Sequence, residues 1–353
     1  MNDTSLAFME RLRLSVPIVQ APMAGCQASA LAIAAGDAGA LGSLPGALLG
    51  IEALRDEVRA VRARAGRPVN VNFFCHVPAA VDEAREQAWR AALRPYYAEL
   101  GVDPSSIATG PGRLPFGDDA AALIEELRPE VVSFHFGLPA PELLDRVRRT
   151  GAQIWSTATT VDEALWLEAR GVDAVIAQGF EAGGHRGMFL TDDVTTQLGT
   201  MALVPQVVAA VRLPVIAAGG IADAAGVAAA LRLGAVAVQI GTAFLLCPEA
   251  TTTATHRAAL ASKAARHTAL TNLFTGRPAR GIVNRLMREL GPLSELPPAF
   301  PGAVNALVPL RAAADKAGRE DFSPLWSGQN AHGARSIPAA EVVRALATMI
   351  ESR

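Results

Sequence analysis

The residues that could do chemistry are most concentrated in EAGGHRG, residues 181–187. This stretch follows the apolar run DAVIAQGF, which is typical of a buried strand. His185 could act as an acid, a base or a hydrogen-bond donor, and Arg186 supplies a fixed positive charge. Gly183 and Gly184 have no side chains, so their amide groups could come close to an anion or a flat ring. We therefore predict a ligand-binding loop here.

The next two apolar runs also end in glycine, in AAGGIAD (217–223) and QIGTAF (239–244). Glycine amides and a helix N-terminus at such positions commonly form a phosphate site. We assign that role to Gly219, Gly220, Gly241 and Thr242. The alternative without a function for residues 181–187 is a flexible glycine loop with a surface histidine. The glycines at the ends of these two later runs argue against it.

Other polar residues follow the earlier apolar runs, and their roles stay open. The alternation of VNVNFF places Asn72 inside a barrel, either as a satisfied core amide or as a ligand contact. His135 lies between two phenylalanines in SFHFG, where a core or supporting role is commoner than catalysis. Gln178 sits near the end of its run. The stretch QAPMAG is either a turn or a backbone contact at Ala21, Pro22 and Met23.

Eight short apolar runs must position these residues. They span residues 17–25, 39–46, 68–74, 131–137, 152–159, 173–184, 213–220 and 235–242. Alanine-rich helical patterns such as 160–171 and 223–234 separate most of them and end in glycine, with Thr160 and Asp223 as expected N-caps. Buried strands alternating with helices predict parallel βαβ units, and eight of them favour a (β/α)8 barrel of the TIM type. A doubly wound sheet is the structural alternative.

Two stretches depart from the βα alternation. Residues 75–130 are too long for one connecting helix and contain two helical patterns, at 81–101 and 118–130. The chain from about residue 246 is rich in proline and helical patterns. We predict a barrel over residues 12–245 that includes a helical insertion at 75–130. Residues 246–353 would form a helical and loop extension that packs on the barrel.

Composition narrows the class of protein. The 353 residues carry a net charge of −2, which gives no whole-chain argument for binding nucleic acid or an anionic membrane. No apolar run reaches the length of a membrane span, and the first residues do not resemble a signal peptide. Cys26, Cys75 and Cys247 are widely spaced, which predicts neither a disulfide framework nor a metal site. We expect a reduced cytoplasmic protein, monomeric or homodimeric, that acts on a small molecule.

Five motifs together carry a family resemblance: PIVQAPMAG, EAGGHRG, PVIAAGGIAD, QIGTAFL and GRPARG (276–281). They resemble the nitronate monooxygenases, formerly called 2-nitropropane dioxygenases, which are FMN-dependent (β/α)8 barrels. The resemblance spans about residues 12–335. The VNFF and SFHFG strands and the terminal LWSGQ are most similar to the nitronate-oxidising class. Flavin-dependent quinone reductases and an enoyl reductase of fatty-acid synthesis also look similar.

The resemblance implies a role for each matching residue. His185 would be the catalytic histidine, with His135 and Asn72 beside the substrate. Trp326, Gly328 and Gln329 of LWSGQ would close over the flavin. Other FMN contacts would be Ala21, Pro22, Met23, Asn72, Gln178, Gly183, Gly184, Gly219, Gly220, Gln239, Gly241 and Thr242. Some members place tyrosines around the pocket, whereas here the only tyrosines are Tyr96 and Tyr97 and a phenylalanine, Phe300, stands where an aromatic hydroxyl is expected.

The implied reaction is the FMN-dependent oxidation of alkyl nitronates, and of nitroalkanes, by O2 to carbonyl compounds and nitrite. His185 would abstract the α-proton of a neutral nitroalkane, or bind and orient a nitronate anion. The alternative is an NAD(P)H-dependent FMN oxidoreductase acting on a quinone or an enoyl thioester. A third hypothesis is a flavin- or phosphate-ligand-binding protein without useful turnover.

Overall fold

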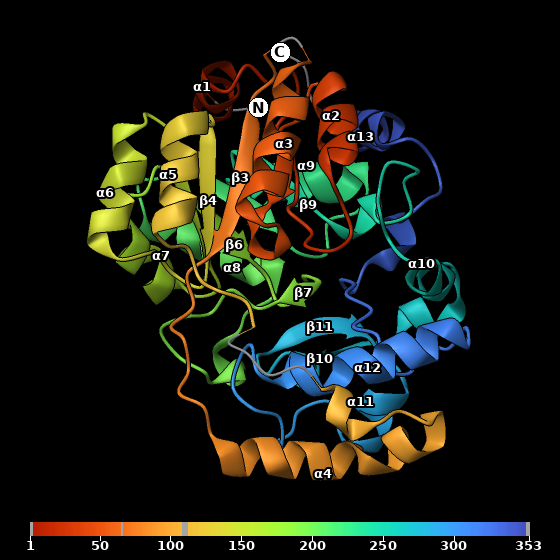
Figure 1. The fold of residues 1–353 in the computed structure, drawn as a ribbon. Coiled ribbons are helices and arrows are strands. Elements are labelled where there is room, and N and C mark those ends of the chain that lie inside the picture. Colours follow the sequence, from red (N-terminus) through yellow and green to blue (C-terminus); the bar gives the residue numbers. More distant parts are fainter. Residues whose placement is uncertain (1–2, 65, 108–111, 351–353) are drawn as a thin grey trace.

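The computed structural model describes residues 3–64, 66–107 and 112–350, and its centre is a barrel of eight parallel strands (Figure 1). The strand order is β1-β9-β8-β6-β5-β4-β3-β2, and a bridge between Val19 and Leu41 joins the first strand to the start of the last. Each of the eight predicted runs contains one barrel strand, so the predicted (β/α)8 fold is confirmed. The strands are β1 (Ile18–Gln20), β2 (Gly42–Pro45), β3 (Val69–Phe74), β4 (Val131–His135), β5 (Gln153–Ala158), β6 (Ala174–Gln178), β8 (Val215–Ala218) and β9 (Ala237–Ile240).

Helices cover the outside of the barrel because each buries one apolar stripe. In α3 the buried residues are Leu54, Val58 and Val61, spaced three and four apart as a helix facing a core requires. The predicted N-caps are confirmed: Thr160 and Asp223 each accept a hydrogen bond from a backbone N–H in the first turn. The barrel helices are α2 (Ser29–Asp37), α3 (Ile51–Arg62), α5 (Asp118–Leu127), α6 (Pro141–Arg149), α7 (Val161–Glu168), α8 (Thr200–Ala210), α9 (Ala224–Arg232) and α13 (Ala339–Ala347).

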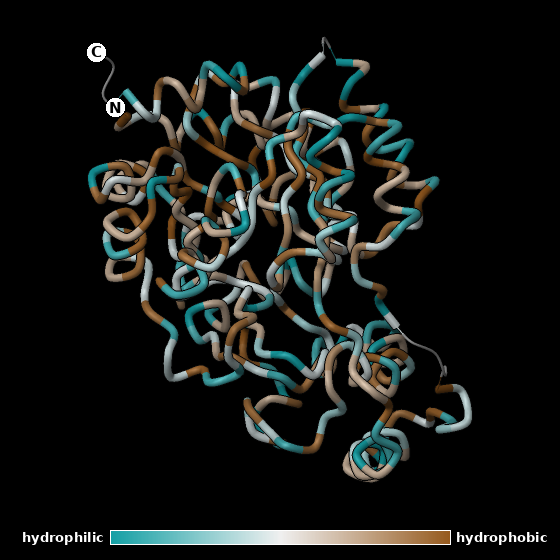
Figure 2. Tube along the Cα trace, turned by 90° about the vertical axis from the view of Figure 1, so that its left-hand side faces the viewer, coloured by the Kyte–Doolittle hydropathy of each residue, from teal (hydrophilic) through white to brown (hydrophobic). Residues whose placement is uncertain are grey.

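The two ends of the barrel differ. At the N-terminal end, α1 (Asp3–Arg11) packs Phe8 and Met9 into a buried cluster with Trp155 and Ile216 from the strands. That end is therefore filled by side chains. The C-terminal ends of the strands face a second, smaller layer, which lies below the barrel in Figures 1 and 2.

This smaller layer combines parts of the chain that are far apart in sequence. Its antiparallel sheet has the order β10 (Thr268–Thr271), β11 (Ala279–Ile282) and β7 (Gly184–His185). Around it lie α4 (Glu83–Leu100), α10 (Ala254–Ala261), α11 (Arg285–Glu289) and α12 (Ala303–Lys316). A separate apolar cluster holds Trp89 and Leu93 of α4 against Leu307 and Leu310 of α12.

The predicted insertion divides between the two layers. Its first helix, α4, packs against α12, whereas its second, α5, packs against α3 and α6 on the barrel. The C-terminal residues leave the barrel after β9 and return to it through α13, which packs against α2 and α9. Among the residues described, no helix combines the length and the apolarity needed to cross a membrane.

Candidate active site

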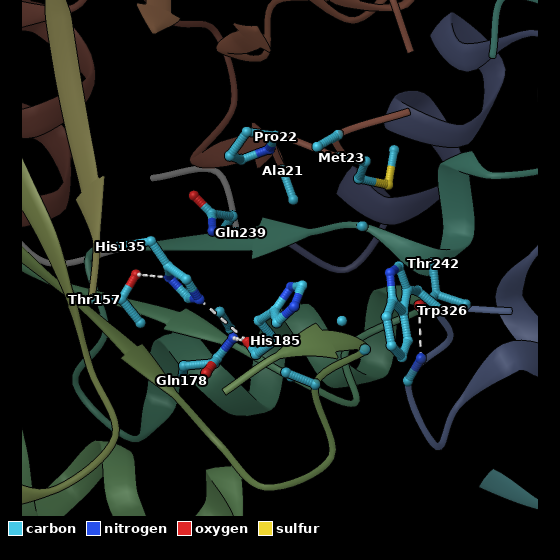
Figure 3. A pocket seen from close by; sticks show the side chains of 18 of the residues that line it. Ala21, Pro22, Met23, His135, Thr157, Gln178, His185, Gln239, Thr242 and Trp326 are labelled. Atoms are coloured by element: carbon cyan, nitrogen blue, oxygen red, sulfur yellow. Dashed lines mark hydrogen bonds between the residues drawn. The ribbon is translucent and has the colours of Figure 1, made fainter. Parts of the chain in front are cut away.

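A cavity lies at the C-terminal ends of the barrel strands, under the smaller layer (Figure 3). Strand ends from around the barrel contribute to its lining, as parallel strands of a closed barrel require. All the residues predicted to contact the flavin or the substrate line it, except Gln329, and Arg186 of the predicted ligand-binding loop also lies outside it. Those that line it are Ala21, Pro22, Met23, Asn72, His135, Gln178, Gly183, Gly184, His185, Gly219, Gly220, Gln239, Gly241, Thr242, Trp326 and Gly328.

His185 reaches the cavity on a strand and not on a free loop. Gly184 and His185 form β7, which pairs with Arg280 and Ala279 of β11. The ring is buried among aromatic side chains, with centroids 5.4 Å from Phe300 and 5.5 Å from Trp326. Figure 3 shows His185 between His135 and Gln178 on one side and Trp326 on the other. The strand pairing and the aromatic packing fix the ring in one place.

One nitrogen of His185 is held by the protein and the other is available. Nε2 lies 3.0 Å from Oγ1 of Thr275, and that hydroxyl also donates to the carbonyl oxygen of Arg277 at 3.3 Å. With the hydroxyl proton on Arg277, Nε2 must carry a proton and donate it to Thr275. Nδ1 has no hydrogen-bond partner among the described residues. It is not enclosed by protein atoms, so it opens to the cavity.

Burial keeps His185 neutral. It lowers the pKa of His185 well below the ordinary histidine value, and the positive charges of Arg113 and Arg277 lower that pKa further. A neutral imidazole with its Nδ1 lone pair facing the cavity can accept a proton. If Thr275 instead donates its proton to Nε2, the ring carries hydrogen on Nδ1 and becomes a donor to an anion.

The side chains of His135 and Gln178 hold the backbone of His185 in place. The carbonyl oxygen of His185 accepts from Nε2 of His135 at 3.2 Å and from Nε2 of Gln178 at 3.0 Å. Nε2 of His135 therefore carries the proton, and Nδ1 accepts from the hydroxyl of Thr157 at 3.0 Å. Burial lowers the pKa of His135 to about 3. With both ring nitrogens engaged, His135 positions His185.

The glycine turns fit a phosphate group. Gly219 and Gly220 line the cavity and adopt positive φ angles of +113° and +70°, a backbone conformation that favours glycine. The amide N–H groups of Gly219, Gly220 and Thr242 donate to no acceptor in the part of the chain that the structure describes. Three unpaired donors at one edge of a cavity suit an oxyanion.

Two amide side chains that line the cavity suit a flat, polar ring. Oε1 of Gln239 is buried without a hydrogen-bond donor among the described residues, although a buried amide oxygen normally has one. Asn72 gives its Nδ2 hydrogens to Ser133, and its carbonyl oxygen still faces the cavity. A flavin ring offers an imide N–H and carbonyl groups to such partners. The residues present therefore fit a flavin mononucleotide, with its phosphate at the glycine turns.

The segment 326–329 closes one side of the cavity. Trp326 pairs with Gly281, and the amide of Gly328 donates to Oγ1 of Thr242 at 3.0 Å. Nε2 of His256 donates to the carbonyl oxygen of Trp326 at 3.1 Å, which fixes this segment from behind. Gln329 donates its backbone N–H to Glu181 and does not line the cavity, which differs from the predicted flavin contact.

Arg186 does not place its charge in the cavity. Its guanidinium is fully buried and donates to the carbonyl oxygens of Gln178 and Gly179 and to Oε1 of Gln197, at 2.6–3.0 Å. The side chain thus satisfies carbonyls at the end of β6 and fixes the turn that leads to His185. The prediction of a charge for ligand binding is wrong here because backbone acceptors behind the turn hold all three donor groups.

Several residues that line the cavity or hold it together were not predicted from the sequence. Phe74 and Asn330 line it, and Thr275 holds His185 from the segment before β11. Asn330 could have been predicted, because it directly follows LWSGQ. Arg113 also lines the cavity, and it lies between the two helical patterns that the sequence predicts at 81–101 and 118–130. No local sequence pattern signals that Arg113 reaches the cavity.

Buried histidines predict a protein that loses stability in weak acid. Burial lowers the pKa of His135 to about 3 and that of His256 to about 4, and it lowers the pKa values of His185 and His76 in the same direction. In the unfolded chain these rings titrate near pH 6.5. Below that pH the unfolded state binds more protons, so the free energy of unfolding should fall by up to about 5 kcal/mol per pH unit for four such groups.

Urea unfolding at pH 7, 6 and 5 measures this effect. The window lies above the range in which the paired carboxylates titrate, so that the histidines dominate. Replacing the exposed His332 by Gln should leave the slope unchanged, whereas His256→Gln should reduce it by about one quarter, because it removes one group of four. A free energy of unfolding that is constant from pH 7 to 5 would contradict this role of burial.

Comparison with known proteins places the chain in a family. The family model for nitronate monooxygenase matches residues 7–348. The nitronate monooxygenase of Pseudomonas aeruginosa is 44% identical over 348 residues, 96% of this chain and 97% of that protein. The nitroalkane oxidase of Streptomyces ansochromogenes has a TM-score of 0.87 at 40% identity, covering 98% of this chain and 97% of that one. FabK from Thermotoga maritima has a TM-score of 0.71 at 25% identity, over 97% and 95%. The chain belongs to the nitronate monooxygenase family.

Proposed function

We propose that this enzyme binds FMN and uses O2 to oxidise alkyl nitronates, and nitroalkanes, to carbonyl compounds and nitrite. The observation that carries the proposal is the placement of His185. It is a neutral imidazole fixed on β7, with Nε2 held by Thr275 and Nδ1 open to the cavity. The family relationship and the likeness to a nitroalkane oxidase support the same reaction.

The cofactor would be held in two parts. The free amides of Gly219, Gly220 and Thr242 would bind its phosphate. Gln239 and Asn72 would face the polar edge of its ring, and Trp326 and Gly328 would close the cavity. When bound, FMN supplies the capacity to accept electrons from the substrate and pass them to oxygen.

His185 prepares the substrate for that step. With a neutral nitroalkane, Nδ1 accepts the acidic α-proton and the substrate becomes a nitronate. With a nitronate supplied as such, the other tautomer donates from Nδ1 to the nitronate oxygens and orients them. Phe74, Phe136, Phe300 and Trp326 surround the ring and exclude water from this proton transfer.

An anaerobic experiment tests the proposal and its alternative. The flavin released by heat from the purified protein should be FMN by mass. Mixing the protein with propyl-1-nitronate without oxygen should bleach the flavin absorbance, whereas NADH should not. Rapid bleaching by NADH alone would favour a nicotinamide-dependent reductase in the same barrel. Bleaching by neither would favour a binding protein without turnover.

Thr275 provides a second prediction from the same geometry. Thr275→Val removes the partner of Nε2 and leaves the ring free to choose its tautomer and angle. We expect kcat with nitroethane to fall about tenfold, the order of one lost hydrogen bond of about 1.4 kcal/mol, with little change in FMN content. Thr275→Ser should restore most of the activity because it returns the hydroxyl. Equal kcat in the Val variant and the wild type would remove Thr275 from the mechanism.

We also propose that the protein is located in the cytoplasm. Cys26, Cys75 and Cys247 are all free thiols in the structure. Free thiols without a disulfide suit a reducing compartment.

A further inference from the structure

Arg113 gives the cavity its one fixed charge. Among the described residues that line the cavity it is the sole lysine or arginine, and no aspartate or glutamate lines it. The guanidinium is half-buried, and no hydrogen bond or ion pair joins it to any residue that the structure describes. The adjoining stretch 108–111 contains no acidic residue. A partly desolvated cation without a counter-ion is costly unless a ligand provides the anion.

The backbone of Arg113 is anchored beside the ring of His185. Its carbonyl oxygen accepts from Nε2 of His76 at 3.1 Å. His76 packs edge-on against Phe300, with centroids 4.8 Å apart, and Phe300 packs edge-on against His185 at 5.4 Å. After Arg113, Phe116 donates its backbone N–H to Phe74 at 2.8 Å. These contacts fix Arg113 at the histidine side of the cavity.

The other groups near this side do not replace Arg113. Arg277 lies over the ring of Phe136 and donates to the carbonyl oxygen of Met188, so its charge is held outside the lining. Arg311, on α12, also stands outside the lining and pairs with Asp315. The flavin phosphate is assigned to the glycine turns. The charge of Arg113 is therefore left for the substrate.

We propose that Arg113 binds the substrate through a planar pair of anionic oxygens and makes this enzyme selective for anionic nitro compounds. This inference rests on the proposed function. A guanidinium matches two oxygens on one carbon or nitrogen through a pair of parallel N–H bonds, as in a carboxylate or a nitronate. A carboxylate and a nitronate both present such a pair of oxygens. A substrate with a nitronate alone and one with both groups distinguish the two.

The experiment compares Arg113→Gln with Arg311→Gln, which removes the same charge close by but outside the cavity. Steady-state kinetics use propyl-1-nitronate, with one anionic group, and propionate 3-nitronate, with two. We expect Arg113→Gln to raise KM for propionate 3-nitronate at least tenfold while kcat changes less than threefold, and Arg113→Lys to recover part of the loss. Arg311→Gln should match the wild type.

The pattern across substrates identifies the anion. If KM rises for both nitronates, Arg113 binds the nitronate oxygens. If KM rises for propionate 3-nitronate alone, Arg113 binds the carboxylate. KM values equal to those of Arg311→Gln for both substrates would overturn the proposal, and so would a loss of FMN from Arg113→Gln with no change in KM once FMN is restored.

A binding measurement separates this proposal from the proposed function. Nitrate is planar and anionic like a nitronate but is not a substrate, and its binding is followed by the change in flavin absorbance. We expect its Kd to rise at least tenfold in Arg113→Gln and to stay constant in Arg311→Gln. If the wild type oxidises neither nitronate, the proposed reaction fails while the nitrate titration still decides whether Arg113 binds anions.

Discussion

Replacing His185 by Asn should leave FMN bound and reduce kcat/KM for a neutral nitroalkane such as nitroethane by about 10²–10⁴-fold. The asparagine would keep a side chain of similar length but offers no lone pair of sufficient basicity to accept the α-proton, and positioned proton transfer is worth about this factor. With propyl-1-nitronate the loss should be smaller, because the proton has already left. Steady-state oxygen uptake with both substrates measures the difference.

His332→Asn is the matched control, since His332 is exposed and does not line the cavity. FMN content per protein should equal that of the wild type in both variants. An unchanged kcat/KM for nitroethane in His185→Asn would remove His185 from the reaction. An equal loss with both substrates would mean that His185 acts on binding or orientation and not on the proton.

Gly183→Val should separate the cofactor from the protein. A Cβ on Gly183 would lie 2.5 Å from the backbone nitrogen of Gly328 and 2.6 Å from the carbonyl carbon of Ser327. Both neighbours are backbone atoms, so the segment that closes the cavity must move, which costs about 1–3 kcal/mol. We expect FMN affinity to fall about tenfold or more, because 1.4 kcal/mol is one factor of ten.

The flavin absorbance per protein after gel filtration measures FMN occupancy, and circular dichroism shows whether the barrel remains folded. Gly50→Ala is the control, because a Cβ there meets nothing within 4 Å and its φ of −66° suits any residue. Gly183→Ala makes the same contact with a smaller side chain and guards against a variant that does not fold. Full occupancy in folded Gly183→Val would contradict the close packing described here.

The barrel could be predicted from the sequence because its signals are local. A buried parallel strand needs a short apolar run, and a helix needs an apolar stripe with a cap. The residue types of 173–178 and 213–218, and the caps at Thr160 and Asp223, satisfy these needs without information from the rest of the chain. The cavity at the strand ends then follows from barrel geometry.

The smaller layer was harder to predict because its contacts are non-local. β7 has two residues, too few for a strand pattern, and it exists because β11, much later in the chain, pairs with it. Likewise, α4 finds its apolar partner in α12. The position of the His185 ring depends on Thr275 and Phe300, which are also distant in sequence. The resemblance to a family indicated His185 but not the residues that hold it.

The direction in which the charged side chains point also could not be predicted from the sequence. EAGGHRG places His185 and Arg186 side by side in sequence, yet successive side chains of extended backbone point to opposite faces. His185 faces the cavity, whereas Arg186 faces backbone carbonyls behind it. The charge that does line the cavity belongs to Arg113, which lies between the two predicted helices of the insertion.

Oxygen uptake and nitrite release, followed together in air, test the central claim most directly. The purified protein is given propionate 3-nitronate in one assay and NADH with a quinone in another. We predict that oxygen is consumed with release of nitrite in the first assay and that NADH is not oxidised in the second. Fast NADH oxidation with no nitrite from the nitronate would contradict the proposed reaction and assign the same barrel and cavity to a reductase.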